Sequence, residues 1–235
     1  MSIEIRPLTA HHDFVDAVRL QKEIWGFQEI ELLPVRLFVV ATKVGGQVFG
    51  AFDGSRMIGF LLAIPGVKPG GKSYLHSHMM GVLPGYRDVG LGRRLKEIQR
   101  ADAVERGIQL IEWTFDPLEL KNAFFNIERL GAVVRRYVLN QYGTTSSHLH
   151  GGLPTDRCIA EWHIGAPRPD AQIEAEVEIP NAIAELRKSD PVKAREIQKK
   201  ASERFLAAFQ KELTVVRFER RKESGVYLLG RWPSE

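Results

Sequence analysis

The sequence has little cysteine and no long apolar run. Its single cysteine, Cys158, excludes an intramolecular disulfide and suits a reducing, cytoplasmic location. No apolar stretch approaches the roughly 20 residues that a membrane-spanning helix needs. The alternating start of the chain, residues 1–6, lacks the apolar core of a signal peptide. We therefore expect a cytoplasmic protein with no membrane partner.

Positive charge is not concentrated in any one stripe. The net charge is +4 with 26% charged residues, and basic side chains alternate with acidic ones along most helical segments. The densest basic stretch, residues 217–222, is short and is typical of a solvated turn and edge strand. We expect no nucleic-acid partner, although an interaction domain that uses these C-terminal strands stays open as an alternative. The mild basicity would help to attract an anionic ligand.

The most informative stretch is residues 82–95. An apolar strand pattern stops at Pro84, and then Arg87 precedes the pair Gly90-x-Gly92 and a helical pattern. Such a loop leaves several N–H groups unpaired at a helix N-terminus, where they and about half a positive charge from the helix dipole hold phosphate oxygens. The loop lacks the Gly-Lys-Ser/Thr and Gly-x-Gly-x-x-Gly patterns of nucleotide-binding loops. An ordinary strand-to-helix turn is the alternative.

Periodicity and chain breakers predict a β-α-α-β-β-β-α-β-α-β-β order over residues 3 to about 165. The expected strands are 3–8, 47–52, 57–64, 74–83, 108–113, 133–139 and 158–164, and the expected helices are 14–25, 35–44, 91–104 and 120–130. Residues 53–55 predict a hairpin and residues 65–72 a loop.

A second segment follows the linker at residues 166–169. It predicts a strand at 176–179, helices at 181–189 and 192–211, and strands at 215–218 and 225–229. We interpret residues 1–165 as one domain and residues 166–235 as a C-terminal α/β extension, a helix and hairpin packed on that domain over a sheet edge. The extension's element order also echoes that of residues 3–64, which leaves a half-repeat open.

The spacing Arg87-x-x-Gly90-x-Gly92, after a strand that ends at Val82, resembles the cofactor loop of the GNAT N-acetyltransferase superfamily. Residues 122–132 resemble a later motif of the same superfamily, with asparagine, a small residue, an aromatic residue and a terminal Leu-Gly. The element order is also that of the superfamily. The resemblance implies an α/β (α+β) fold with a mixed, mostly antiparallel central sheet, helices on both faces and two splayed central strands.

The resemblance also implies the activity and the co-substrate. A GNAT enzyme takes acetyl-CoA or another acyl-CoA, and an amine of a small molecule attacks the thioester directly. The amides of Met80, Gly81 and Val82 would then hold the pantetheine arm, and an amide at a strand kink near Val82 would stabilise the oxyanion. The residues that would contact the rest of the cofactor are Arg87, Asp88, Val89, Gly90, Leu91, Gly92 and Arg93 at the pyrophosphate, with Asn122 as a further contact.

Three side chains are candidates for the general base. His76 lies where some members of the superfamily carry a glutamate base, and an imidazole with a pKa of about 6.5 suits that task. His78 shares the face of His76 by strand alternation, and Glu112 reaches the same gap from the neighbouring strand. Each could instead be a structural polar group. No third ligand stands at a recognisable spacing from the two histidines, so we expect no metal.

One position departs from the superfamily pattern. Ile127 stands where many members carry a tyrosine that protonates the leaving thiolate, and Tyr137 or Tyr142 would have to replace it. This departure keeps a second hypothesis open, a non-catalytic module that binds or senses acyl-CoA. An amino acid is a candidate acceptor, since five basic residues could line a carboxylate site as readily as they could lie on the surface: Arg135, Arg136, His148, His150 and Arg157. The sequence leaves the choice of acyl group and a homodimer open.

Overall fold

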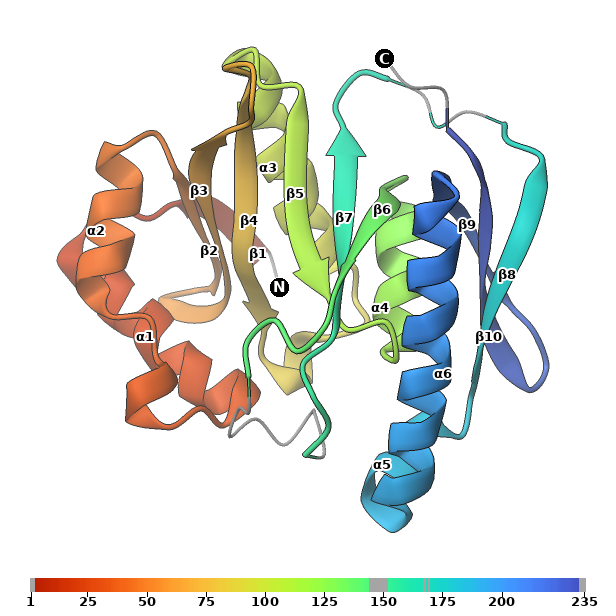
Figure 1. The fold of residues 1–235 in the computed structure, drawn as a ribbon. Coiled ribbons are helices and arrows are strands. Elements are labelled where there is room, and N and C mark those ends of the chain that lie inside the picture. The colour runs from red at the N-terminus through yellow and green to blue at the C-terminus, as the bar shows by residue number, and fades with distance from the viewer. Residues whose placement is uncertain (1–2, 144–151, 167, 169, 233–235) are drawn as a thin grey trace. The chain divides into compact units, whose positions relative to one another are not determined.

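The computed structural model describes residues 3–143, 152–166, 168 and 170–232. The chain forms two compact units, Met1–Glu112 and Trp113–Glu235. It passes from the first to the second within strand β5 (Leu110–Phe115), which is labelled in Figure 1. The boundary at residue 165 between a domain and its extension stays a prediction.

Unit 1 is built on an antiparallel sheet. Its strands lie in the order β1 (Ile3–Pro7), β2 (Gln47–Asp53), β3 (Arg56–Val67) and β4 (Ser73–Val82), and each pairs antiparallel with the next. The start of β5 pairs with β4 in parallel, with Leu75 opposite Ile111 and His76 opposite Glu112. Glu112 is also the last residue of unit 1, so the predicted parting of β4 from β5 stays a prediction.

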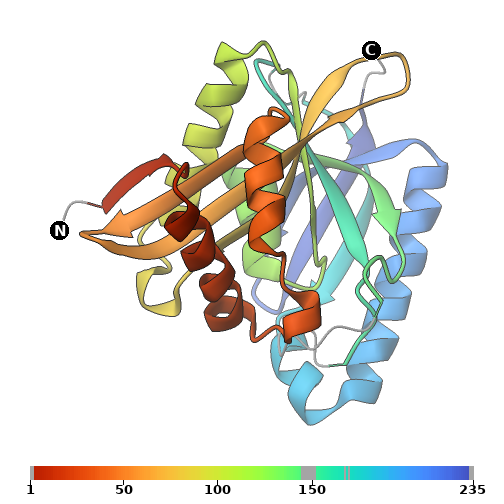
Figure 2. The same cartoon turned by 90° about the vertical axis from the view of Figure 1, so that its left-hand side faces the viewer.

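Helices cover both faces of this sheet, as predicted. Figures 1 and 2 show α1 (His11–Trp25) and α2 (Val35–Lys43) on one face and α3 (Leu91–Glu105) on the other. Trp25 packs edge-on against Phe60 of β3, while Lys96 of α3 reaches Ser77 of β4 from the opposite side. Helix α1 ends at Gly26, which has the left-handed φ of 71° expected of a glycine cap.

A β-bulge interrupts β4 at His78. Leu62 pairs with Met79 but its neighbour Ala63 pairs with Ser77, so β4 carries one residue more than β3 at this point. The bulge reverses which face each later side chain takes. Ser77 and Met80 therefore both lie toward α3. Ser77 accepts a hydrogen bond from Lys96 of that helix, and a Cβ at Gly92 in its first turn would lie 3.7 Å from the Met80 methyl group.

Unit 2 contains the rest of the strands, in the order β7 (Arg157–His163), β6 (Val133–Val138), β9 (Leu213–Arg220), β10 (Ser224–Arg231) and β8 (Ile173–Pro180). Val215 of β9 pairs with Val134 of β6, so the C-terminal segment continues the sheet from the edge of β6. Strand β8 pairs with β10, whereas β1 pairs with β2, the next strand after it in the chain. The half-repeat interpretation is therefore wrong.

The helices of unit 2 are α4 (Leu120–Phe124), α5 (Ile183–Ser189) and α6 (Pro191–Gln210). The helix predicted over 120–130 contains a π-helical turn at Phe125–Arg129, in which the Leu130 N–H donates to the Phe125 carbonyl. Such turns insert one residue into a helix and are frequent at functional sites. No helix among the residues described is both long and apolar enough to cross a membrane.

Several predicted boundaries in unit 1 were wrong, such as that of α1, which begins at His11 rather than 14, and two of them have a clear physical reason. Strand β5 begins at Leu110 rather than 108, because Gly107 and the hydrogen bond from Ile108 N to Ala103 O still close helix α3. Strand β3 continues through Pro65 to Val67, into the predicted loop. Strand β2 begins at Gln47, opposite Ala63, so Pro65 lies where β3 has β4 as its neighbour on one side only, a position that tolerates proline.

The contact between α1 and β4 predicts the effect of a substitution at Gly81. A Cβ there would lie 2.6 Å from the Trp25 ring and 2.8 Å from the Ile24 side chain. We expect Gly81→Ala to lower the free energy of unfolding by about 1–3 kcal/mol through overpacking, measured by urea denaturation. Gly85→Ala is the control, since its Cβ would have no atom within 4 Å. An unchanged midpoint for Gly81→Ala would contradict this packing.

Candidate functional site

The loop between β4 and α3 presents a row of unpaired backbone amides. After the short 3-10 turn η2 (Pro84–Tyr86), the next intrachain backbone hydrogen bond is that of Arg94 N with Gly90 O, at 3.1 Å. Between them, no N–H from Asp88 to Arg93 donates to another described residue. These amides include the first three of helix α3, where the helix dipole is positive. The arrangement offers an anion what it needs, namely convergent donors and positive charge.

The backbone of this loop depends on left-handed conformations. Gly90, the residue before the helix, has φ 83°, and Asp88 has φ 62°, which few residues other than glycine, asparagine and aspartate adopt readily. Arg87 folds back so that its Nε donates to the Val82 carbonyl at 3.0 Å. The Tyr86 hydroxyl donates to Asp53 at 2.7 Å and fixes the loop to the β2–β3 hairpin. The loop is thus held at both ends while its middle is exposed.

The amides of β4 that lead into the loop alternate in direction. Leu83 donates to Ile58 of β3 at 2.9 Å, so the N–H groups of Met80 and Val82 point away from β3. This is the edge of β4 on which β5 pairs nearer the start of the strand. Gly81, by contrast, faces β3 through its own N–H and α1 through its missing side chain. Met80 and Val82 are therefore the two amides directed at the predicted gap.

The three candidate bases lie together in unit 1. His76 is the register partner of Glu112, and the rings of His76 and His78 have centroids 5.7 Å apart. The sequence placed His76 and His78 on one face by strand alternation. The bulge at His78 interrupts that alternation, but the two rings stay close together. Glu112 is buried, and Lys68 Nζ at the tip of the β3–β4 hairpin donates to its Oε1 at 2.5 Å.

Burial sets the protonation of this cluster. Burial lowers the pKa of His76 to about 4, with further lowering by the charges of His78, Lys96 and Lys68. Burial also lowers the pKa of His78. Both imidazoles are therefore neutral at pH 7. A neutral imidazole can accept a proton, but one with a pKa of about 4 is a weaker base than the ordinary histidine assumed from the sequence.

The sequence did not suggest two lysines of this cluster. Lys96 of α3 is buried, and its Nζ donates to Ser77 Oγ at 2.8 Å and to Gln99 Oε1 at 2.9 Å. Burial lowers its pKa to about 7. The signal in the sequence was a lysine among the apolar residues of the helix stripe, next to Leu95. Lys68 gave no signal, since its partner Glu112 is 44 residues away.

The remaining predicted residues lie in unit 2. Asn122 is exposed on α4 and accepts a hydrogen bond from Asn126 at 3.3 Å, so its contact with a cofactor stays a prediction. Ile127 is fully buried in the π-helical turn. The Tyr137 hydroxyl is buried between Ser202 and Asp156, and burial raises its pKa above the usual range, which suits a structural group. Tyr142 is half exposed, and its hydroxyl lies 2.9 Å from that of Thr114.

The predicted carboxylate site is not assembled as one group. Arg135 and Arg136 both pair with Glu161, while Arg157 lies buried beside Asp116 and under the ring of Tyr142. His148 and His150 lie outside the described residues. Over the described ranges, no group of three or more His, Cys, Asp or Glu side chains is arranged to hold a metal ion.

Three solved structures illustrate which known proteins this chain is similar to. The chain matches Arabidopsis thaliana NAA60 in complex with acetyl-CoA with a TM-score of 0.57 at 15% identity, over 70% of this chain and 100% of the other. The Escherichia coli ribosomal-protein-S18-alanine N-acetyltransferase matches with a TM-score of 0.54 at 19% identity, over 73% and 99%. An acetyltransferase of the GNAT family from Streptococcus pneumoniae matches with a TM-score of 0.53 at 16% identity, over 70% and 100%.

At these identities the likeness is one of fold. The chain has the fold of the GNAT acetyltransferases, which confirms the fold class that the motifs and the element order predict. No model of a known protein family matches the sequence, and no curated protein sequence does.

The lowered pKa of His76 predicts how stability depends on pH. The unfolded chain protonates this histidine near pH 6.5, whereas the folded chain does so near pH 4. The unfolded state therefore binds more protons in that window, and stability should fall as the pH is lowered, by at most about 1.4 kcal/mol per pH unit. Above pH 6.5 this contribution is fully present.

Urea unfolding of the wild type and of His76→Gln across this window checks the expectation. His76→Gln should have the flatter profile, and His11→Gln, at an exposed position at the start of α1, should keep the wild-type slope. Equal slopes for all three proteins would mean that His76 titrates alike in the folded and unfolded states.

Proposed function

We propose that this protein is an acyltransferase. It moves an acetyl or another short acyl group from acyl-CoA to an amine of a small molecule, such as an amino acid, by direct attack of the amine on the thioester. The observation that carries the proposal is the row of unpaired amides from Asp88 to Arg93 at the start of α3, in a chain with the fold of acetyltransferases. One of the structures with that fold is named as a complex with acetyl-CoA.

The proposed cofactor site lies almost entirely in unit 1. The amides from Asp88 to Arg93 would bind the pyrophosphate, and the exposed guanidinium groups of Arg87 and Arg93 would add charge-assisted hydrogen bonds. The outward amides of Met80 and Val82 would pair with the pantetheine arm as a neighbouring strand would. The same amides are donors for the oxyanion that forms on the thioester carbonyl. A cofactor contact of Asn122, in unit 2, stays a prediction from the resemblance.

The reaction needs an amine without its proton. A lysine side chain with a pKa of about 10.4 needs about 4.6 kcal/mol to lose its proton at pH 7, while an α-amine needs only about 1–1.4 kcal/mol. We propose that His76 and His78 accept this proton, since both are neutral at pH 7, and that Glu112 orients His76 from the paired strand. Another structure with this fold is named for acetylation of a protein alanine, so an acceptor panel should include peptides beside amino acids.

A second candidate function is a module that binds acyl-CoA without catalysis. The observation that favours it is that two of the three candidate positions for the acid offer none, since Ile127 is apolar and the Tyr137 hydroxyl is buried in a structural hydrogen-bond network. Free thiol released from acetyl-CoA in the presence of the acceptor panel decides between the two functions. Tight binding without turnover on any acceptor would favour the module.

A substitution at Gly92 would change cofactor binding without lowering stability. A Cβ at this position would meet one ordinary contact, 3.7 Å from the Met80 methyl group, and alanine is the better helix former. Gly92→Ala should therefore fold at least as stably as the wild type. Its Cβ would nevertheless occupy the space that a phosphate needs beside the amides, so we expect the affinity for CoA to fall about tenfold or more, which corresponds to about 1.4 kcal/mol.

Titration calorimetry with CoA and urea unfolding measure the two effects. Gly85→Ala is the matched control, because it is the same change in the same loop region at a position where the Cβ meets nothing within 4 Å. If Gly92→Ala bound CoA with wild-type affinity, the proposed pyrophosphate site at Asp88 to Arg93 would be wrong, whatever the acceptor.

A variant that lacks the general base can be recognised from how its loss of kcat depends on pH. Removing a general base costs about 10²–10⁴-fold in rate. That loss should shrink as the pH approaches the pKa of the amine, because the amine then loses its proton without help. We expect His76→Gln or His78→Gln to lower kcat by such a factor at pH 7, with little change in the KM for acyl-CoA and with recovery at high pH. Glu112→Gln, with a smaller and pH-independent loss, serves as the comparison. A loss that stays constant with pH in both histidine variants would exclude them as bases.

A further inference from the structure

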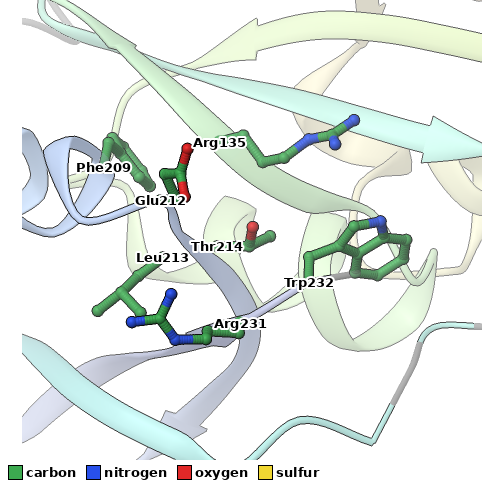
Figure 3. Close-up of a pocket in the computed structure, with 7 residues that line it drawn as sticks. All are labelled: Arg135, Phe209, Glu212, Leu213, Thr214, Arg231 and Trp232. Carbon is green, nitrogen blue, oxygen red and sulfur yellow. The ribbon is translucent and has the colours of Figure 1, made fainter. Parts of the chain in front are cut away.

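A hollow in unit 2 is lined by side chains that the proposed transfer does not use. It encloses about 500 Å³, and Figure 3 shows the residues that line it: Arg135, Phe209, Glu212, Leu213, Thr214, Arg231 and Trp232. They come from β6, from the last turn of α6, from the turn and the start of β9 that follow it, and from the end of β10 and the residue after it. A volume of about 300–1,000 Å³ is usual for small-molecule sites.

The hydroxyl of Thr214 lies at the centre of this hollow. The residue is only 1% exposed, and its Oγ1 makes no hydrogen bond within the part of the chain that the structure describes. Figure 3 shows that the hydroxyl points into the hollow. The hydroxyl faces the open space of the hollow rather than the packed interior, so a polar atom of a bound molecule can replace water as its hydrogen-bond partner.

Arg135 offers the hollow a charged hydrogen-bond donor, which favours an anionic acceptor. Arg135 uses Nε and Nη2 for Glu161, which leaves Nη1 without a hydrogen bond to any described residue. Arg136 pairs with the same carboxylate, so two positive charges face one negative charge. Burial raises the pKa of Glu161, but hydrogen bonds from His163 and Arg135 and the charges of both arginines lower it to about 2. Glu161 therefore stays ionised and is shared by two arginines, while the lining adds one charge of each sign, Glu212 and Arg231.

The rest of the lining limits the size and charge of the ligand. Trp232 is held by stacking on His163, with ring centroids 5.5 Å apart, and it offers an aromatic face beside the apolar side chains of Phe209 and Leu213. The carboxylate of Glu212 lines the same hollow and disfavours a ligand with two negative charges. A single negative charge joined to a flat apolar body fits both features.

We propose that this hollow binds a small monocarboxylate with a flat apolar body. The carboxylate accepts hydrogen bonds from Arg135 and from the Thr214 hydroxyl, and the apolar body lies on Trp232 between Phe209 and Leu213. The site belongs to unit 2, and this proposal does not depend on the proposed transferase reaction.

Calorimetry on the full chain without acyl-CoA tests the ligand class, with 3-phenylpropionate as the probe. We expect binding with a Kd of about 1 mM or tighter, and affinities at least about tenfold weaker for the neutral 3-phenylpropanamide and the dianionic phenyl phosphate. Absence of binding by the carboxylate up to about 10 mM, or equal affinity of the amide, would overturn the proposal.

Two variants test the site itself. Thr214→Val keeps the shape of the side chain and removes the hydroxyl, which should weaken binding about tenfold, the effect of one hydrogen bond to a charged group. Trp232→Leu, directly after β10, removes the aromatic face and should weaken binding further. This variant decides the question if Thr214→Val folds poorly. Thr42→Val is the matched control, the same change at an exposed position on α2, and should bind as the wild type does. Wild-type affinity in both unit 2 variants would place the probe elsewhere.

Discussion

The unpaired amides at the start of α3 are the constraint on which the functional argument rests. Six consecutive N–H groups, from Asp88 to Arg93, have no acceptor within the described residues. This conformation requires left-handed backbone at Asp88 and Gly90, and the first of these is a strained position for a residue with a Cβ. A turn that served only to connect β4 with α3 would have no reason to hold that strain, whereas a bound diphosphate would use every one of these donors.

A second constraint is the extra residue at His78. Without the bulge, residues three apart on β4 would face opposite sides of the sheet, and Ser77 and Met80 could not both lie toward α3. With it, Lys96 anchors α3 to the strand before the bulge, and Met80 lies under the first turn of the helix after it. The bulge thus fixes the helix N-terminus against the two amides, at Met80 and Val82, that point toward the predicted gap.

The sequence predicted what depends on local pattern. The loop, its glycines and the order of elements in the chain were readable because turn chemistry and periodicity act over a few residues. The bulge was not readable, since it shows only in the register against β3, and the resemblance placed a strand kink near Val82, whereas the register places a bulge at His78. The partners of the candidate bases were not readable either, because Lys96 and Ser77 are 19 residues apart and Lys68 and Glu112 are 44 apart. The swapped strand order of unit 2 was hidden for the same reason, as β8 pairs with β10 across the whole of α5 and α6.

The electrostatics of the cluster follow from this placement. Burial and the nearby lysines hold His76 neutral to about pH 4 in the free protein, which makes it a weak base. A CoA molecule on the adjoining loop would bring several negative charges into unit 1, and a nearby negative charge raises the pKa of a histidine. Lys96, with a pKa lowered to about 7 by burial, would respond in the same direction. Under the proposed function, CoA binding would therefore raise the pKa of these histidines toward neutral pH, where a general base is most effective.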